Sequence, residues 1–177
     1  MTTAYTPMVQ QYLEVKRQHE DELLFFRLGD FYEMFGPDAE TASRILGIAL
    51  TGRAGGNGTK VPMCGVPFHA ADNYIAKLIS AGLKVAVCEQ LEDPKAVKGI
   101  VKRDVIRIMT PGTVLESNIL KEKDSNYLIA LVKSADKYAL AALEASTGEF
   151  MAVDLDNEAD VINEILRFEP AECICAI

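Results

Sequence analysis

The residues with the most distinctive chemistry form one short segment, Gly29-Asp30-Phe31-Tyr32-Glu33-Met34-Phe35. Three aromatic residues in five, interleaved with acids, exceed what the preceding apolar run needs to complete a core. One interpretation makes Phe31 and Phe35 core residues, with Tyr32 partly buried. The other makes the segment an exposed aromatic tip beside a carboxylate, able to stack on a flat ligand. If the segment is extended, Phe31 and Glu33 share one face and Tyr32 lies on the other.

A glycine-rich stretch from Gly52 to Lys60 suggests phosphate binding, but its order is wrong. Gly58-Thr59-Lys60 inverts the Gly-Lys-Ser/Thr order of a nucleotide-binding P-loop. The cysteines do not form a zinc or redox motif, because Cys173 and Cys175 are spaced C-x-C and small buried thiols explain them better. We therefore expect no cofactor and no metal in this chain.

Four acids lie close together in the sequence, at Asp30, Glu33, Asp38 and Glu40. Paired carboxylates can hold magnesium for nuclease chemistry. Asp38 and Glu40, however, are also what the first turn of a helix prefers. The structural interpretation is favoured, and we expect no catalytic residue here.

The elements that must position the aromatic segment follow from periodicity and turn residues. Gly52–Lys60 is expected to be a mobile loop, and Val61–Pro67 an irregular connection because prolines disfavour a central strand. Strands separated by helices predict an α/β domain with a mixed sheet over residues 1–117. Helices are expected over Pro7–His19, Pro37–Leu46 and Ala70–Ala81, and strands over Leu23–Leu28, Ile48–Thr51, Leu83–Gln90 and Val105–Met109.

After a polar linker at residues 118–124, the pattern changes to short strands. Runs at 127–133, 137–143 and 150–155 predict a meander, which a helix over 156–168 and an apolar strand at 173–177 follow. A buried final strand needs neighbours to pair its backbone. We therefore expect residues 125–177 to be the start of a second domain, truncated within a longer protein.

Composition narrows the class of protein. The 177 residues are 49% hydrophobic and 25% charged, with no apolar run that could span a membrane and no signal peptide, which predicts a cytoplasmic globular protein. The net charge of −8 argues against bulk electrostatic binding of nucleic acid. Residues 1–117 carry 13 basic and 14 acidic side chains, however, against 5 and 12 in residues 118–177. The objection therefore applies to the second part alone.

Four segments of the sequence are distinctive: Thr6-Pro7-Met8-x-x-Gln11-Tyr12, Phe26-Arg27-Leu28-Gly29-Asp30-Phe31-Tyr32-Glu33, Cys88-Glu89-Gln90 and Arg107-Ile108-Met109-Thr110-Pro111-Gly112-Thr113. In this order, they resemble the N-terminal part of the MutS family of bacterial DNA mismatch repair proteins. The resemblance covers essentially the whole chain. It implies a mismatch-recognition domain over residues 1–117 and the start of a connector domain from residue 125, whose family fold is ribonuclease H-like.

In that family, the phenylalanine of a Phe-x-Glu motif enters the DNA minor groove and stacks at the mispaired base of kinked DNA. The glutamate accepts a hydrogen bond from that base. The resemblance therefore implies that Phe31 is the wedge and Glu33 the acceptor. Arg53, Lys60 and Met63, on the glycine-rich segment, are candidate supporting contacts to DNA.

The resemblance also implies a longer protein with its own partners. That protein is expected to be a homodimer with an ATPase domain that uses ATP and magnesium, to bind mismatched double-stranded DNA and MutL, and to act in the bacterial cytoplasm in association with the nucleoid. The present chain is expected not to be an enzyme. Glu144 stands where a catalytic ribonuclease H-like protein would need an aspartate, so the fold does not imply that activity.

Two alternative functions stay open. The first is a metal-dependent nuclease-like domain that uses Asp30 or the acids of the second domain. The second is a fragment of a MutS paralogue that acts outside repair. Phe31 and Glu33 argue against the paralogue, since a protein without mismatch recognition need not keep them.

Overall fold

The computed structural model describes residues 5–56, 58–93, 96–114 and 125–175. The chain forms two compact units, Met1–Met109 and Thr110–Ile177. The expected domain boundary at residue 117 and the linker at 118–124 lie outside the described residues. Each unit is a mixed α/β structure, as the sequence predicted.

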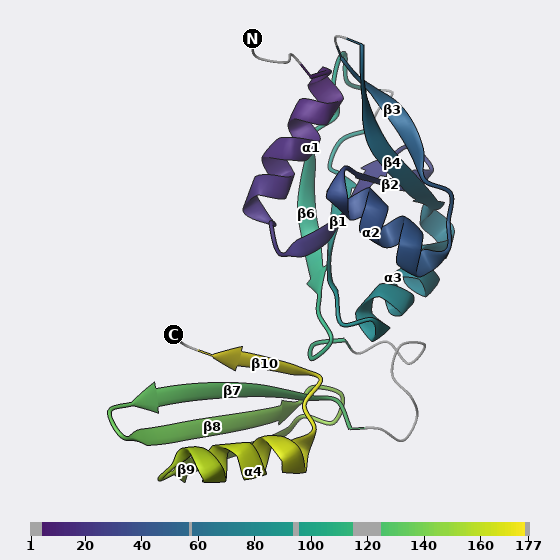
Figure 1. The fold of residues 1–177 in the computed structure, drawn as a ribbon. Coiled ribbons are helices and arrows are strands. Elements are labelled where there is room, and N and C mark those ends of the chain that lie inside the picture. The colour runs from purple at the N-terminus through teal and green to yellow at the C-terminus, as the bar shows by residue number, and fades with distance from the viewer. Residues whose placement is uncertain (1–4, 57, 94–95, 115–124, 176–177) are drawn as a thin grey trace. The chain divides into compact units, whose positions relative to one another are not determined.

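The first unit is built on a six-stranded mixed sheet in the order β3-β4-β2-β1-β5-β6 (Figure 1). Only the β1–β5 pair is parallel among these described strands. The strands are β1 (Glu22–Leu28), β2 (Phe31–Phe35), β3 (Thr51–Gly56), β4 (Thr59–Pro67), β5 (Lys84–Gln90) and β6 (Arg103–Met109). The helices are α1 (Pro7–Gln18), α2 (Pro37–Leu46) and α3 (Ala71–Ser80), with the 3-10 turn η1 at Phe68–Ala70.

Helices cover both faces of this sheet (Figure 1). On one face, Tyr12 of α1 packs with Leu24, Phe26 and Phe35 in a buried cluster. On the other, α2 contacts β2 and β4, and the Cys64 thiol donates to the Ala39 carbonyl of α2 at 3.4 Å. Strand β1 is therefore buried from both sides, which explains its nearly continuous apolar sequence.

The three predicted helices of the first unit are confirmed to within a residue at each end. Helix α2 ends at Leu46 because Gly47 adopts the left-handed conformation, with φ 67°. Helix α3 is followed by Gly82, whose φ is 81° and whose N–H donates to the Ile79 carbonyl at 2.8 Å. The glycines marked these helix ends in the sequence.

The predictions for residues 48–67 were wrong. Ile48–Leu50 is not a strand, and the expected loop and irregular connection form a β-hairpin of β3 and β4. Gly55 is needed for close packing, because a Cβ at this position would lie 2.8 Å from both the Thr59 hydroxyl and Val61. Thr6 holds the hairpin by donating its N–H to the Gly55 carbonyl at 2.7 Å.

Strand β4 accepts Pro62 although it lies between β3 and β2. The Pro62 carbonyl accepts from the Gly36 N–H at 2.9 Å, on the β2 side and beyond the last paired residue of β2, Phe35. The amide nitrogen of a strand residue points to the same side as its carbonyl. The missing N–H of Pro62 therefore faces a place where β2 has already ended, and the ladder loses no hydrogen bond.

The second unit is a four-stranded sheet in the order β10-β7-β8-β9, with α4 packed on one face. Its elements, β7 (Tyr127–Ser134), β8 (Lys137–Glu144), β9 (Glu149–Leu155), α4 (Glu158–Phe168) and β10 (Glu172–Cys175), match the predicted meander, helix and final strand. Strand β10 pairs parallel to β7. Ile129, Leu140 and Phe168 lie in the core between sheet and helix.

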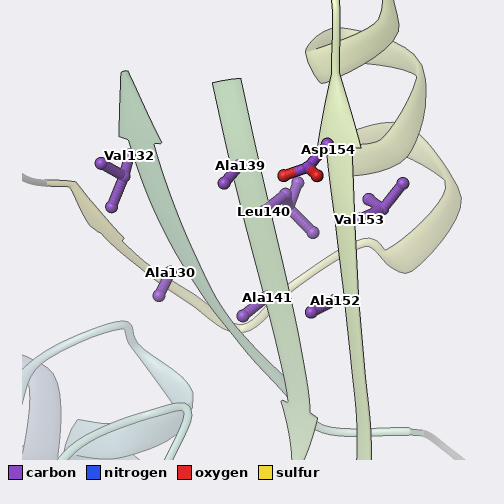
Figure 2. A pocket seen from close by; sticks show the side chains of 8 residues that line it. All are labelled: Ala130, Val132, Ala139, Leu140, Ala141, Ala152, Val153 and Asp154. Carbon is purple, nitrogen blue, oxygen red and sulfur yellow. The ribbon is translucent and has the colours of Figure 1, made fainter. Parts of the chain in front are cut away.

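The face of this sheet opposite α4 carries small side chains. Ala130, Ala139, Ala141 and Ala152 come from three adjacent strands and leave a shallow hollow of about 270 Å³ (Figure 2). Asp154 lines the same hollow (Figure 2).

The cysteines only partly follow the prediction of buried thiols. Cys64 and Cys88 are buried, but Cys173 and Cys175 are exposed, with their sulfur atoms 3.7 Å apart. The prediction failed for this pair because β10 is an edge strand of the described sheet.

Candidate nucleic-acid interface

Phe31 is the first residue of β2 and follows directly on the β1–β2 turn. Gly29 takes φ 60° in this turn, a conformation that glycine adopts without strain. Leu28 and Phe31 are cross-strand partners, so the hairpin closes immediately after the turn. The Phe31 side chain is 46% exposed, whereas Phe35 at the other end of the strand is 2% exposed. The core therefore uses Phe35, and Phe31 is the exposed aromatic tip of the second interpretation.

Alternation along β2 separates the three residues as predicted. Tyr32 is buried on the opposite face from Phe31, and its hydroxyl donates to the Glu89 carboxylate of β5. Burial, followed by the hydrogen bond to Glu89, raises the pKa of Tyr32 to about 12. The phenol therefore stays protonated and remains a donor at neutral pH.

Arg27 ties the turn to the same carboxylate. Its Nη1 lies 3.3 Å from Glu89 Oε1, and its Nε donates to the Gly29 carbonyl at 2.5 Å. The guanidinium also stacks over the ring of Phe68, 3.9 Å from the ring centroid. Phe68 in turn donates its N–H to the Asp30 carbonyl at 2.9 Å. Both residues of the turn are therefore anchored through their carbonyls.

Glu33 lies on the same face of β2 as Phe31 and forms an ion pair with Arg53 Nη1 of β3. Its cross-strand partner on β4 is Gly65. A Cβ on Gly65 would lie 3.2 Å from the Tyr32 carbonyl and 3.4 Å from Glu33 Cγ. The glycine thus leaves the space that the Glu33 side chain occupies.

The three candidate supporting residues have different surroundings. Arg53 pairs with Glu33, and its side chain is 38% exposed. Met63 is half-buried and packs against the core cluster beneath α1. Lys60 is exposed next to the hairpin turn and, by strand alternation, lies on the opposite face from Met63. The structure therefore brings Arg53 to the Phe31–Glu33 face but not Lys60.

Asp38, one of the acids weighed as metal ligands, has other partners. Asp38 Oδ2 accepts from the Tyr12 hydroxyl and from the Leu24 N–H, both at 3.0 Å, and its Oδ1 pairs with Lys16 at 3.1 Å. Within the described ranges, no group of three or more His, Cys, Asp or Glu side chains is placed to hold a metal ion.

Glu144 has a structural role in the second unit. Its carboxylate accepts from the Ser146 hydroxyl at 2.8 Å and from the Thr147 N–H at 2.6 Å, at the turn between β8 and β9. Hydrogen bonds from Thr147 and Ser146 lower the pKa of Glu144 from 4.5 to about 2. The carboxylate is thus held ionised as an acceptor for the turn.

Of the basic residues between Lys95 and Arg107, Arg103 is unavailable to DNA. It is buried, and its guanidinium donates to the Arg27 carbonyl at 2.7 Å, to Gln11 Oε1 at 2.8 Å and to the Val101 carbonyl at 3.0 Å. Burial lowers its pKa. Lys98 and Lys102 are exposed, and Lys95 lies outside the described residues.

Sequence reasoning did not identify Arg27, Glu89, Phe68 or Gly65 as parts of this site. Arg27 and Glu89 do fall within two of the motifs, but 62 positions separate them in the chain. Only the pairing of β1 with β5 brings them together.

Comparison with known proteins places the chain in the class of DNA mismatch repair proteins. Residues 6–118 match the family model described as MutS domain I, and residues 126–176 match MutS domain II. The chain belongs to the MutS family. Among curated proteins named DNA mismatch repair protein MutS, it is 56% identical over 172 residues to that of Acetivibrio thermocellus and 54% identical over 175 residues to that of Desulforamulus reducens.

These alignments cover 96% and 97% of this chain but 20% of each relative. The protein from Staphylococcus saprophyticus is 53% identical over 172 residues, which is 97% of this chain and 19% of the relative. The chain thus spans about a fifth of the length of the curated relatives it matches. In the part of the chain that the structure describes, no helix is both long and apolar enough to cross a membrane.

Proposed function

We propose that this chain recognises mispaired bases in duplex DNA, with Phe31 as a wedge that stacks at the mispair from the minor groove. The observation that carries the proposal is the placement of Phe31. A large aromatic side chain is 46% exposed at the first position of a strand whose next residue is buried. A residue that the core does not use is free to stack on a base.

The energetics suit discrimination between similar duplexes. Unstacking a base step costs a few kcal/mol, and stacking a base on an aromatic ring returns about 1–3 kcal/mol. Because these terms nearly cancel, small differences in the DNA decide whether the wedge enters. A mispaired step has already lost pairing and stacking energy and bends more easily than a matched step. Deformability is then the signal, and one phenylalanine serves many different mispairs.

Glu33 contributes discrimination rather than affinity. Phosphates repel a carboxylate, so Glu33 helps only where a base offers it a hydrogen-bond donor. Its carboxylate lies on the same face of β2 as Phe31 and forms an ion pair with the positively charged guanidinium of Arg53. Substitution Glu33→Ala in the full-length protein should therefore reduce the preference for mismatched over matched duplex. A uniform loss of affinity with the preference intact would contradict this role.

The direct test of the wedge is Phe31→Ala in the full-length protein. We expect the variant to lose most of its preference for mismatched duplex, measured as the ratio of the two dissociation constants. A matched control is Phe150→Ala, which removes another exposed phenylalanine, 65% exposed, from the second unit. Unchanged preference in the Phe31 variant would refute the assignment.

The roles of the complete protein extend this proposal. We propose a homodimer with ATPase sites that use ATP and magnesium, in which the second unit relays signals to the ATPase and offers a docking surface for MutL. We place it in the bacterial cytoplasm, associated with the nucleoid. The present chain would act without catalysis of its own.

The nuclease alternative is not favoured, because in the described parts of both units neither Asp30 nor an acid of the second unit belongs to a group of three or more His, Cys, Asp or Glu side chains that could hold a metal ion. A purified chain incubated with duplex DNA and magnesium should leave the DNA uncut. Magnesium-dependent cleavage would support the alternative.

A further inference from the structure

We infer that Arg53 is a positioning residue for mismatch discrimination and that it acts through the carboxylate of Glu33. This inference rests on the proposed function of Glu33 and adds the residue that makes its carboxylate usable. It differs from a phosphate contact, in which Arg53 would add affinity for any duplex.

The ion pair joins two strands of the sheet that are not neighbours. Arg53 belongs to β3, the edge strand, and Glu33 belongs to β2, with β4 between them. Gly65 of β4, which is the cross-strand partner of Glu33, has no side chain to fill the space beside it. Arg53 lies opposite Val61 of β4, so its guanidinium reaches Glu33 diagonally, and Gly65 leaves room for the carboxylate that it meets.

Both side chains of the ion pair are partly buried. The side chain of Glu33 is 16% exposed and that of Arg53 is 38% exposed. An ion pair at such a boundary is screened less than one on the open surface. Without Arg53, Glu33 would be a partly buried carboxylate with one fewer partner, and its side chain would have freedom to turn away from the wedge face.

When DNA approaches, the ion pair affects both the acceptor positions and the effective charge of the Glu33 carboxylate. A carboxylate has about four acceptor positions, so it can hold Arg53 and still accept a hydrogen bond from a base. The positive charge on Arg53 offsets the repulsion between the carboxylate and the phosphates. Arg53 thus fixes both the direction and the effective charge of the acceptor.

The experiment is a double-mutant cycle in the full-length protein, with variants Arg53→Gln, Glu33→Gln and both together. Dissociation constants for mismatched and matched duplexes are measured at several salt concentrations. We expect Arg53→Gln to lower the ratio between the two constants by about tenfold, the value of one weak charge-assisted hydrogen bond. In the Glu33→Gln background, the same substitution should leave the ratio unchanged.

Two further variants serve as controls for charge and for the loss of an arginine. Arg53→Lys keeps the charge but not the fork of donors, and we expect it to restore part of the ratio. It also serves as the test variant if Arg53→Gln fails to fold. Arg44→Gln removes an exposed arginine from α2 and is expected to leave the ratio unchanged.

Different failures have different patterns. If Arg53→Gln weakens both duplexes equally, reduces the salt dependence and leaves the ratio intact, Arg53 is a phosphate contact and the inference is overturned. An equal fall of the ratio in both Glu33 backgrounds would overturn it too, since Arg53 would then act independently. If Glu33→Ala, which removes the acceptor altogether, leaves the ratio unchanged, the proposed role of Glu33 fails, and the inference fails with it.

Discussion

Substitution Tyr32→Phe tests whether the contacts behind the wedge matter for recognition. The change removes one hydroxyl, leaves the buried ring in place and alters no exposed surface. The lost bond is the one from the Tyr32 hydroxyl to the Glu89 carboxylate, which also holds Arg27 and through it the turn before Phe31. We expect lower stability and, in the full-length protein, a weaker preference for mismatched duplex.

The magnitude follows from the contacts that remain. A hydrogen bond to a charged group contributes about 1.5–3 kcal/mol. Glu89 keeps Arg27 at 3.3 Å and the Gln90 N–H at 3.3 Å, so it is not left unpaired. The free energy of unfolding of the first unit should therefore decrease by an amount near the lower end of that range, about 1.5 kcal/mol. At about 4 °C per kcal/mol, the melting temperature should fall by roughly 6 °C.

Tyr12→Phe provides a matched control in the same unit. Tyr12 is also buried, and its hydroxyl donates to the Asp38 carboxylate at 3.0 Å. Asp38 likewise keeps two other partners, the Leu24 N–H and Lys16. The Tyr12 hydroxyl also accepts from the buried Phe35 N–H at 3.4 Å, so Tyr12→Phe should lose at least as much stability as Tyr32→Phe, as measured by urea unfolding.

The DNA measurement then separates stability from positioning. Ratios of dissociation constants for matched and mismatched duplexes are compared below both melting temperatures. Tyr32→Phe should lower the ratio and Tyr12→Phe should not, because only Tyr32 is linked to the turn that carries Phe31. Equal ratios in the two variants would refute the reasoning that the hydrogen bond from Tyr32 to Glu89 helps to position Phe31.

Three other predictions concern stability and bulk binding. Glu144 has a lowered pKa in the folded chain, so its stabilising effect is complete above pH 4.5 and is lost as the pH falls toward about 2; Glu144→Gln should remove this acid dependence in thermal unfolding, and an unchanged pH profile would contradict the assignment. Arg103→Met leaves the Arg27 carbonyl and Gln11 Oε1 without the guanidinium, while the Val101 carbonyl keeps the Gln11 amide at 3.0 Å, and should cost about 2–3 kcal/mol in urea unfolding, whereas a loss below about 0.5 kcal/mol would show that water replaces the guanidinium. The 177-residue chain alone should bind duplex DNA weakly with a shallow salt dependence, because residues 1–117 are nearly neutral; tight, strongly salt-dependent binding would show otherwise.

Periodicity and turn residues predicted the helices and the separation of Phe31 from Tyr32. These features depend on local rules, such as the left-handed glycine after α2 and the alternation of side chains along β2. The mixed fold of both units also followed from the order of the runs. For the same reason, the residues around Phe31 were enough to suggest an exposed tip as one of two interpretations of that segment.

The β3–β4 hairpin and the contacts of Arg27 and Tyr32 with Glu89 could not be predicted in this way. General rules treat glycine as mobile and proline as excluded from central strands, yet Gly55 is required by a close approach and Pro62 faces the end of a neighbouring strand. The contact of Arg27 with Glu89 depends on a strand pairing between distant parts of the chain. Such contacts are set by tertiary structure and leave no local pattern.

The parallel pairing of β1 with β5 also has a consequence for the order of folding. The β1–β2 hairpin is local and can close as soon as it is synthesised, but β5 begins at Lys84, and Glu89 lies near its end. During translation, Phe31 therefore emerges before the carboxylate that anchors its turn. Pairing of distant strands is slow because loop closure comes first. The turn that carries Phe31 thus becomes rigid only when β5 joins β1, after the β1–β2 hairpin has closed.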